Sequence, residues 1–318
     1  MNARTVSSQG YSPFCGKHET CCVCMGNYGK IVREKTSQEG SGNMINKVSA
    51  IFVDIDGTLV NKGENIMPVT KQALETLHEQ GVLLGLSTGR KINNGMFQRA
   101  KDWGLSFQFD MMIGMNGGQL WDRFHPETEN YYLLKTETMK EIIERMSPLD
   151  LNVMIYEDEH MVTLRFDDMI AASMKRNHMK VVVADGNADR LCVNDNYNVL
   201  FRFDPERTEE VAAFAETLAC EKYHAILTSP GIIEFMDPRV NKGMALHKFS
   251  ERNNIPVCEI MAFGDMDNDK EILKEAGWGV CLLNGSDISK SMSDAVTEYP
   301  CTEDGMGRYL AKYVLNQG

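Results

Sequence analysis

The sequence predicts an α/β protein whose parallel sheet is interrupted by an inserted α+β domain. From Val48 onward, short apolar runs rich in β-branched residues alternate with helical stretches, which is typical of a parallel sheet. Between about residues 118 and 238 the pattern changes to short strands in which apolar and polar residues alternate, as in a half-exposed antiparallel sheet. After Asn241 the first pattern returns. A chain of 318 residues is long enough for two such domains.

Composition excludes several classes of protein. The chain is 43% hydrophobic and 25% charged, with 33 basic and 45 acidic residues and a net charge of -12. These values exclude a collagenous or largely disordered chain, and no apolar window is long enough for a membrane helix. The negative charge argues against general nucleic-acid binding. A small anionic substrate stays compatible with it, provided that a metal ion or a local lysine supplies positive charge.

Residues 1–43 are expected to form a disordered leader. They are rich in Ser, Gly, Asn and Lys, and they lack both an apolar period and the apolar core of a secretory signal. An organelle presequence is a weaker alternative. A zinc site at Cys15, His18, Cys21 and Cys24 is disfavoured because the spacing matches no usual finger. The other five of the nine cysteines are scattered singly, which indicates reduced thiols in a cytoplasmic protein.

The first half of the core is expected to alternate strands with helices. Three buried strands and two helices follow in order: strand 49–55, a helix from Pro68 to its stop at Gly81, strand 82–86, helix 90–103 and strand 109–115. Apolar residues without polar alternation indicate strands that are buried on both faces.

The inserted domain is expected over residues 125–235, and the core over 44–124 and 236–318. Short strands are predicted in the segments GQLWDRF, ENYYLLKT, NVMIYED, HMVTLRF, YNVLFRF, HAILTS and IIEFMDP, with helices near 137–147 and 206–219. The returning core is predicted to form helix 242–253, strand 260–263, helix 268–276, strand 279–283 and helix 286–295.

The segment Asp54-Ile55-Asp56-Gly57-Thr58-Leu59 follows the first predicted strand. A carboxylate at the carboxyl end of such a strand points into the crevice where open α/β sheets bind ligands. Two aspartates two residues apart are expected on the same side of the strand or of its exit turn. Taken alone, the segment is also compatible with an ordinary acidic turn around Gly57.

Two further segments supply groups that bind anions. Ser87-Thr88-Gly89-Arg90 ends the second strand and is expected to open a helix, where a hydroxyl and free amides bind anions; a simple helix cap is compatible with the same residues. Lys242 is expected to open the helix after the insertion, and alone it would more often be a solvated lysine.

The segment Gly264-Asp265-Met266-Asp267-Asn268-Asp269 follows an apolar strand. Three carboxylates at one strand end repel one another unless they share a cation or a proton. Such a group suits Mg²⁺, a hard ion that takes oxygen ligands.

Together these four segments resemble the haloacid dehalogenase (HAD) superfamily, and they are most similar to its Cof-type phosphatases. The resemblance covers roughly residues 48–316, including the tail 303–307. It implies a Rossmann-like core in which the insertion forms a type IIB cap.

The resemblance implies roles for the acidic residues that the chemistry also supports. Asp54 would attack phosphorus and form an aspartyl phosphate. Asp56 would protonate the leaving oxygen and then deprotonate the hydrolytic water. Asp54, Asp265 and the backbone carbonyl of Asp56 would bind Mg²⁺, with Asp269 supporting the metal shell or orienting Lys242.

The resemblance also implies a set of phosphate ligands. Thr88, Gly89 and Lys242 would hold the phosphate oxygens, and Asn268 would contact them as well. Ser87 replaces Thr88 if the hydroxyl position is shifted by one residue.

The sequence therefore predicts a Mg²⁺-dependent phosphatase of small phosphorylated metabolites, with sugar phosphates as the first expectation. The alternatives are a sugar phosphomutase and a non-catalytic metabolite sensor on the same fold. No nucleic-acid or membrane partner is expected, and the protein is expected to be a cytoplasmic monomer or homodimer.

Three features have a less definite interpretation. Glu234 and Arg239 lie where the insertion returns to the core, and they fit either substrate contacts or surface charges at a hinge. Residues 116–118 (Asn-Gly-Gly) resemble the family's turn toward the cap, but a plain hairpin turn explains them. Residues 185–189 are interpreted as a turn, because the downstream glutamate of a calcium loop is missing.

We expect a chain that starts at Met44 to fold and to keep its activity, because the leader lacks the apolar pattern of a packed segment. Thermal unfolding and phosphate release, measured beside the full chain, test this expectation. A large drop in melting temperature would show that residues 1–43 contribute to the folded domain.

Overall fold

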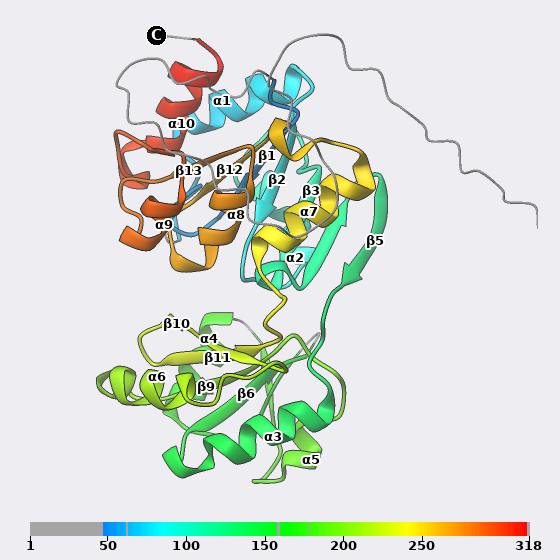
Figure 1. Ribbon diagram of the computed structural model, residues 1–318, viewed down its shortest axis with the longest axis vertical. Helices are drawn as coiled ribbons and strands as arrows, with labels where there is room; N and C mark the ends of the chain where they lie inside the picture. The colour runs from blue at the N-terminus through cyan, green and yellow to red at the C-terminus, as the bar shows by residue number, and fades with distance from the viewer. Residues whose placement is uncertain (1–46, 62, 158–159, 178, 317–318) are drawn as a thin grey trace, which may run out of the picture. The chain divides into compact units, whose positions relative to one another are not determined.

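The computed structural model describes residues 47–316, apart from 62, 158–159 and 178. The expected leader, its possible zinc ligands and the proposed start at Met44 lie outside the described residues. Two sheets organise the rest, an eight-stranded sheet and a six-stranded sheet, which we call the core sheet and the cap sheet (Figure 1).

The core sheet has the strand order β14-β13-β12-β1-β2-β3-β4-β5. The strands from β14 to β3 are parallel, and β4 and β5 are added antiparallel. The strands are β1 (Ala50–Val53), β2 (Leu83–Ser87), β3 (Met111–Gly114), β4 (Gln119–Asp122), β5 (His125–Asn130), β12 (Ile260–Gly264), β13 (Trp278–Cys281) and β14 (Ala295–Val296).

Helices accompany the core sheet in the order expected for an α/β fold. They are α1 (Pro68–Glu79), α2 (Asn94–Asp102), α7 (Lys242–Asn253), α8 (Lys270–Glu275), α9 (Asp287–Met292) and α10 (Gly305–Tyr309). Short 3₁₀ turns and a final π turn are η1 (Met115–Gly117), η4 (Val257–Glu259), η5 (Asp267–Asp269), η6 (Cys301–Glu303) and η7 (Leu310–Val314).

Strand β1 shows why the core sheet is apolar on both faces. Ile51 and Val53 pack into one cluster with the side chains of α1 and α2. Phe52, which points the other way, packs into a second cluster with Phe249 of α7. All four residues of β1 are buried, as the unbroken apolar run predicted.

The cap sheet has the strand order β10-β11-β9-β6-β7-β8. Its strands are β6 (Asn152–Tyr156), β7 (His160–Thr163), β8 (Lys180–Val183), β9 (Asn198–Arg202), β10 (His224–Ser229) and β11 (Ile232–Met236). Its helices and 3₁₀ turns are α3 (Thr136–Met146), η2 (Ser147–Leu149), α4 (Asp168–Asn177), α5 (Ala188–Leu191), η3 (Pro205–Arg207) and α6 (Thr208–Glu216). The α/β fold with an inserted α+β domain is confirmed.

Residues 125–130, which we expected at the start of the insertion, instead form β5 and pair with β4 in the core sheet. The Asp122 carboxylate accepts hydrogen bonds from the backbone N–H groups of Phe124 and His125, which closes a tight hairpin turn. The strand is exposed and polar, so no apolar alternation marked it. The division into core and cap domains otherwise remains a proposal.

Three elements of the cap differ from expectation. Helix α4 and strand β8 lie in a stretch where the sequence predicted neither. The turn expected at 185–189 continues into the short helix α5, because the Asn187 side chain accepts hydrogen bonds from the N–H groups of Asp189 and Arg190.

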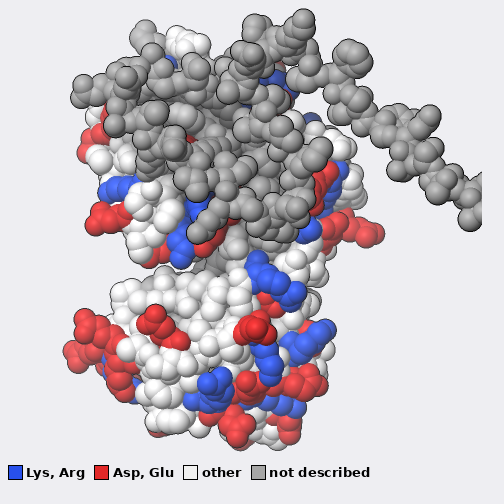
Figure 2. All heavy atoms as spheres, in the orientation of Figure 1, with Lys and Arg blue, Asp and Glu red and all other residues white. Residues whose placement is uncertain are grey.

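Acidic and basic side chains of the cap residues lie beside one another on the face in Figure 2. Ion pairs such as Lys222–Glu141, at 2.8 Å, join side chains of opposite charge in the cap. Among the residues that the structure describes, no helix is both long and apolar enough to span a membrane.

Helix α1 depends on an aspartate that lies far away in the sequence. The Asp304 carboxylate accepts hydrogen bonds from the N–H groups of Val69 and Thr70, both at 2.8 Å, and from the Thr70 hydroxyl at 2.5 Å. These are first-turn groups that have no partner within the helix. The Met67 side chain before the helix supplies no cap. Through Asp304, the tail at 303–307 therefore caps the first turn of α1.

We expect Asp304→Ala to lower the free energy of unfolding by about 2 kcal/mol, because buried N–H groups lose a charged acceptor. Urea denaturation measures this, and Asp304→Asn, which keeps one acceptor oxygen, should lose less. Asp102→Ala, at an exposed position, is the control. Equal stability of Asp304→Ala and this control would contradict the role.

Candidate active site

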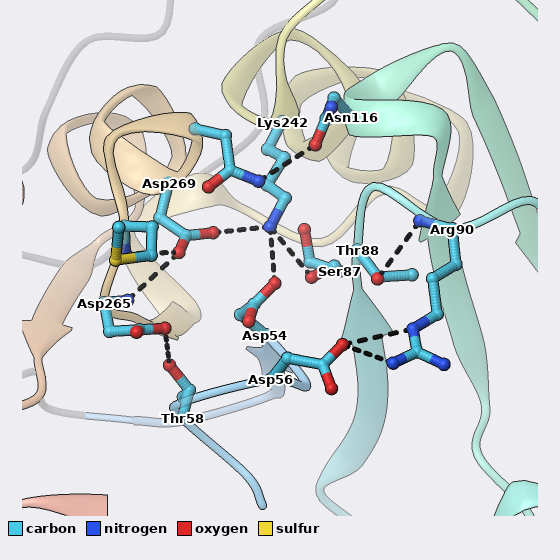
Figure 3. A network of polar contacts seen from close by, with 12 residues as sticks. Asp54, Asp56, Thr58, Ser87, Thr88, Arg90, Asn116, Lys242, Asp265 and Asp269 are labelled. Atoms are coloured by element: carbon cyan, nitrogen blue, oxygen red, sulfur yellow. Dashed lines mark hydrogen bonds and ion pairs between the residues drawn. The ribbon is translucent and has the colours of Figure 1, made fainter. Parts of the chain in front are cut away.

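The first functional side chain, Asp54, lies directly after β1 at the carboxyl end of the core sheet. Its N–H donates to the Phe263 carbonyl in β12 at 3.0 Å, and the residue is 8% exposed. Asp56, two residues on, has a different partner: its Oδ2 accepts from Nε and Nη2 of Arg90, at 3.1 and 2.6 Å (Figure 3). The two aspartates therefore sit in different electrostatic surroundings.

Gly57 allows this loop to lie against the loop after β12. Its φ is +103°, and a Cβ there would lie 2.3 Å from Oδ2 of Asp265. Next to it, the Thr58 hydroxyl donates to Oδ1 of Asp265 at 2.8 Å. The glycine and threonine of the first motif thus position the first carboxylate of the last motif.

Lys242 connects these segments at their centre. It is the first residue of α7, which is capped by the Asn241 side chain, and it is fully buried. Its Nζ donates to Oδ1 of Asp54 at 2.7 Å, to Oδ1 of Asp269 at 2.5 Å and to the Ser87 carbonyl at 3.0 Å (Figure 3). All three protons of the ammonium group have an acceptor.

Asp269 also shapes the loop after β12. Its Oδ2 accepts from the N–H groups of Asp265 and Met266, at 3.0 and 3.2 Å. Asn268 points toward the loop after β3, where its Nδ2 donates to Oδ1 of Asn116 at 3.0 Å. The turn at 116–118 thereby positions a candidate phosphate ligand.

The hydroxyl segment lies at the carboxyl end of β2, but it does not open a helix. Helix α2 begins at Asn94 and is capped by Asn93, so residues 87–90 form a connection before it. Thr88 Oγ1 accepts from the Arg90 N–H at 3.2 Å. Ser87 Oγ is buried without a hydrogen-bond partner among the described residues, and Gly89 is exposed. The expectation that these residues open a helix is wrong, because α2 begins only at Asn94; their role in binding phosphate stays a proposal.

Burial and mutual repulsion dominate the electrostatics of the site. Burial raises the pKa of Asp54 to about 8, with Asp269 and Asp265 adding to the rise and Lys242 opposing it. Burial likewise raises the pKa of Asp265 to about 6, and the charge of Asp269 contributes. For Lys242 burial favours the neutral amine, but Asp269 and Asp54 outweigh it and raise its pKa. The carboxylates lack enough positive charge for all of them to ionise.

These carboxylates fit a divalent metal ion. Asp54, Asp265 and Asp269 are all buried, and each offers an oxygen atom within 4.8 Å of the others. Among the described residues, Lys242 is the ammonium that contacts them, and its single charge leaves part of their negative charge uncompensated. A set of carboxylate oxygens suits a hard cation. Asp269 was expected only to support the metal shell or to orient Lys242. Its carboxylate nevertheless belongs to the same group of oxygen atoms as those of Asp54 and Asp265.

Sequence reasoning missed three contributors to the site. Arg90 pairs with Asp56, Thr58 positions Asp265, and Asn116 positions Asn268. Thr58 and Arg90 belong to the first and second sequence segments described above. Their position within those segments was the signal that could have identified them. Arg239, by contrast, lies between β11 and α7, where it pairs with Asp237 at 2.8 Å and lies over the Tyr132 ring at 4.0 Å.

The comparisons with known proteins agree with this geometry. Residues 51–310 match the haloacid dehalogenase-like hydrolase family, so the chain belongs to that family. The predicted family, fold class and enzyme class, a hydrolase of the phosphatase type, are thereby confirmed.

Three relatives illustrate the match. The chain is 25% identical over 281 residues to 5-amino-6-(5-phospho-D-ribitylamino)uracil phosphatase YitU of Bacillus subtilis, covering 85% of this chain and 99% of the relative. The structure of TM0651 from Thermotoga maritima has a TM-score of 0.71 at 23% identity, over 83% of this chain and 97% of that one. The structure of the HAD subclass IIB sugar phosphatase BT4131 has a TM-score of 0.68 at 22% identity, and the match covers 84% of this chain and 100% of that one.

We expect the buried carboxylates to make stability depend on pH when divalent cations are removed. The folded chain keeps a proton on Asp265 up to about pH 6, whereas an unfolded chain releases it near about pH 4. The stability contributed by this proton is therefore present at low pH and lost as the pH rises through 6. Asp265→Asn should thus gain about 1.4 kcal/mol relative to wild type between pH 5 and pH 8 in EDTA.

Chemical denaturation at the two pH values measures this difference. Millimolar Mg²⁺ at pH 8 should stabilise the wild type and leave Asp265→Asn nearly unchanged, because the variant lacks one ligand. A wild type that gains no stability from Mg²⁺ would argue against a metal site here.

Proposed function

We propose that the protein is a Mg²⁺-dependent phosphatase that hydrolyses small phosphorylated metabolites, sugar phosphates first, through an aspartyl phosphate on Asp54. The observation that carries the proposal is the buried network in which Lys242 holds Asp54 and Asp269 beside Asp265. Three segments far apart in the sequence supply these side chains. The relative YitU, whose name describes a phosphatase of a phosphoribityl compound, supports a phosphate monoester of a polyol as substrate.

In the first step a carboxylate oxygen of Asp54 attacks phosphorus, and the bond from phosphorus to the leaving oxygen breaks. Lys242 keeps the Asp54 side chain oriented and provides positive charge beside it. Asp56 gives a proton to the leaving oxygen, which departs as an alcohol. For this step the Asp56 side chain must leave its ion pair with Arg90.

In the second step Asp56, now a carboxylate, takes a proton from water, and the water oxygen attacks phosphorus. The bond from phosphorus to Asp54 breaks, which releases inorganic phosphate and restores the Asp54 carboxylate. The ion pair with Arg90 suits Asp56 in its basic form. Thr88, whose hydroxyl proton is not used in its contact with the Arg90 N–H, and Asn268 would donate to phosphate oxygens.

Asp54, Asp265 and the backbone carbonyl of Asp56 would hold Mg²⁺, with Asp269 beside them. When bound, the ion would supply positive charge to the phosphoryl oxygens and reduce the repulsion among the carboxylates.

We expect p-nitrophenyl phosphate and a panel of sugar, nucleotide and pyridoxal phosphates to be hydrolysed with Mg²⁺ and not with EDTA. Asp54→Asn should lower kcat by at least about 10³-fold, because it removes the nucleophile. Asp56→Asn should let a phosphorylated enzyme accumulate from p-nitrophenyl phosphate, whose leaving group needs little protonation. Phosphate release and intact-protein mass measure both effects.

As a control, Asn93→Asp exchanges an amide for a carboxylate outside the buried network. Full activity of Asp54→Asn would overturn the mechanism. Turnover that requires a sugar bisphosphate activator would identify a phosphomutase, and binding of phosphate esters without turnover would identify a sensor.

A further inference from the structure

The cap sheet has one apolar face and one face of mixed polarity. Val199, Phe201, Ile233 and Phe235 point to the side on which α3 and α6 pack. On the other side α4 covers part of the sheet, where Ile170 packs with Met154, Leu200 and Ile232. Outside this cluster the second face bears polar side chains as well as apolar ones such as Met236.

Three of these polar residues come from the adjacent strands β9, β11 and β10 (Figure 1). Asn198 and His224 are both register partners of Met236, one from each neighbouring strand. Glu234 lies two residues before Met236 on the same face of the central strand. Asn198, Glu234 and His224, which we call the cap triad, are therefore close neighbours on one sheet face.

The cap triad has hydrogen-bonding capacity that the protein leaves unused. Asn198 Nδ2 donates to Oε2 of Glu234 at 2.9 Å, and the Thr228 side chain also hydrogen-bonds to this carboxylate. Asn198 Oδ1 and His224 Nε2 are buried and have no hydrogen-bond partner among the described residues. Asn198 is only 4% exposed. Buried polar atoms without partners are uncommon because they lose their hydration without compensation.

Contacts link this end of the cap sheet to the active-site side of the core. Tyr197, next to Asn198, accepts from Nε2 of Gln119 at 2.7 Å and donates to Oδ1 of Asn130 at 2.6 Å. Burial lowers the pKa of His224, and the ammonium of Lys270 adds to this effect. Lys270 directly follows Asp269 of the carboxylate cluster. His224 of the cap triad therefore lies within electrostatic range of Lys270, beside the carboxylate cluster.

We propose that Glu234, held in place by Asn198, determines specificity by accepting hydrogen bonds from hydroxyl groups of the leaving group. This inference rests on the proposed phosphatase function and names the part of the cap that selects its substrate.

The chemistry of the cap triad defines the class of leaving group. An ionised carboxylate only accepts hydrogen bonds, and so does the unpartnered Oδ1 of Asn198. Two acceptors side by side fit a group with neighbouring donors, such as the hydroxyls of a sugar or polyol chain. His224 Nε2 adds a third polar atom that donates or accepts according to its tautomer. A leaving group without donors would leave these atoms unpaired, which is the strongest basis for discrimination.

The test compares two kinds of substrate, with and without hydroxyl groups, that make the same chemical demand on Asp54 and Asp56. Glucose 6-phosphate and ribose 5-phosphate have hydroxyl groups, whereas n-butyl phosphate has none, and all of them release a primary alcohol. The wild type should prefer the better sugar phosphate by at least about 30-fold in kcat/KM. Glu234→Gln should reduce this preference at least about 10-fold, because a carboxylate acceptor is replaced by a mixed amide.

Glu209→Gln is the matched control, since it removes the same charge from an exposed position on α6. It should leave the preference unchanged. Melting temperatures of both variants separate folding from recognition. p-Nitrophenyl phosphate serves as a separate reference for the chemical step, and its hydrolysis by Glu234→Gln should stay within about 3-fold of wild type.

Each result has a definite meaning. The proposal is supported if Glu234→Gln loses the preference for sugar phosphates but retains its turnover of p-nitrophenyl phosphate. An equal fall for all substrates means that Glu234 is structural, and a wild type without a preference for hydroxylated substrates also overturns the inference. In both cases Asp54-dependent turnover of p-nitrophenyl phosphate would leave the phosphatase function standing. No turnover of any ester would overturn both.

Discussion

A single buried ammonium group holds the active-site side of the core together. Lys242 is fully buried, and it contacts two carboxylates and one carbonyl that come from three different strand ends. Burying a charge is unfavourable unless partners of opposite charge surround it. Asp54, 188 residues earlier in the chain, and Asp269 supply that compensation. The arrangement is therefore possible only where the strands bring these loops together.

The fold meets this requirement through strand order and through helix α7. Strands β12, β1 and β2 are neighbours in the parallel sheet, so the loops that follow them meet at one edge. Asn241 caps α7 and sets Lys242 at its first turn, after the chain returns from the cap. A Cβ at Gly117, where φ is +110°, would lie 2.2 Å from the Asn241 carbonyl. The turn after β3 thus presses directly against the start of α7.

The residues of the candidate site could be proposed from the sequence because their signals are local. Asp54 and Asp265 directly follow apolar strands, and Lys242 follows a helix-capping asparagine, so each position could be read from its neighbours. Partners were harder to predict. That Thr58 pairs with Asp265, or Arg90 with Asp56, depends on side-chain reach across loops whose paths no periodicity specifies. The exposed strand β5 was misplaced for a related reason: its pairing comes from a turn, not from apolar alternation.

The core and the cap use buried polar groups in contrasting ways. In the core, each proton of Lys242 has an acceptor inside the protein, so the network is complete except for the charge that a cation would add. In the cap, Asn198 donates from its amide group to Glu234, while its own carbonyl oxygen lacks a partner among the described residues. A complete network orients reacting groups without help from the substrate, as the proposed chemistry requires for every phosphate ester. Under the specificity proposal, the incomplete network would gain stability only when a suitable leaving group binds. The two proposals thus assign chemistry and selectivity to different sheets, because preorganisation would serve the first and an unfilled hydrogen bond would serve the second.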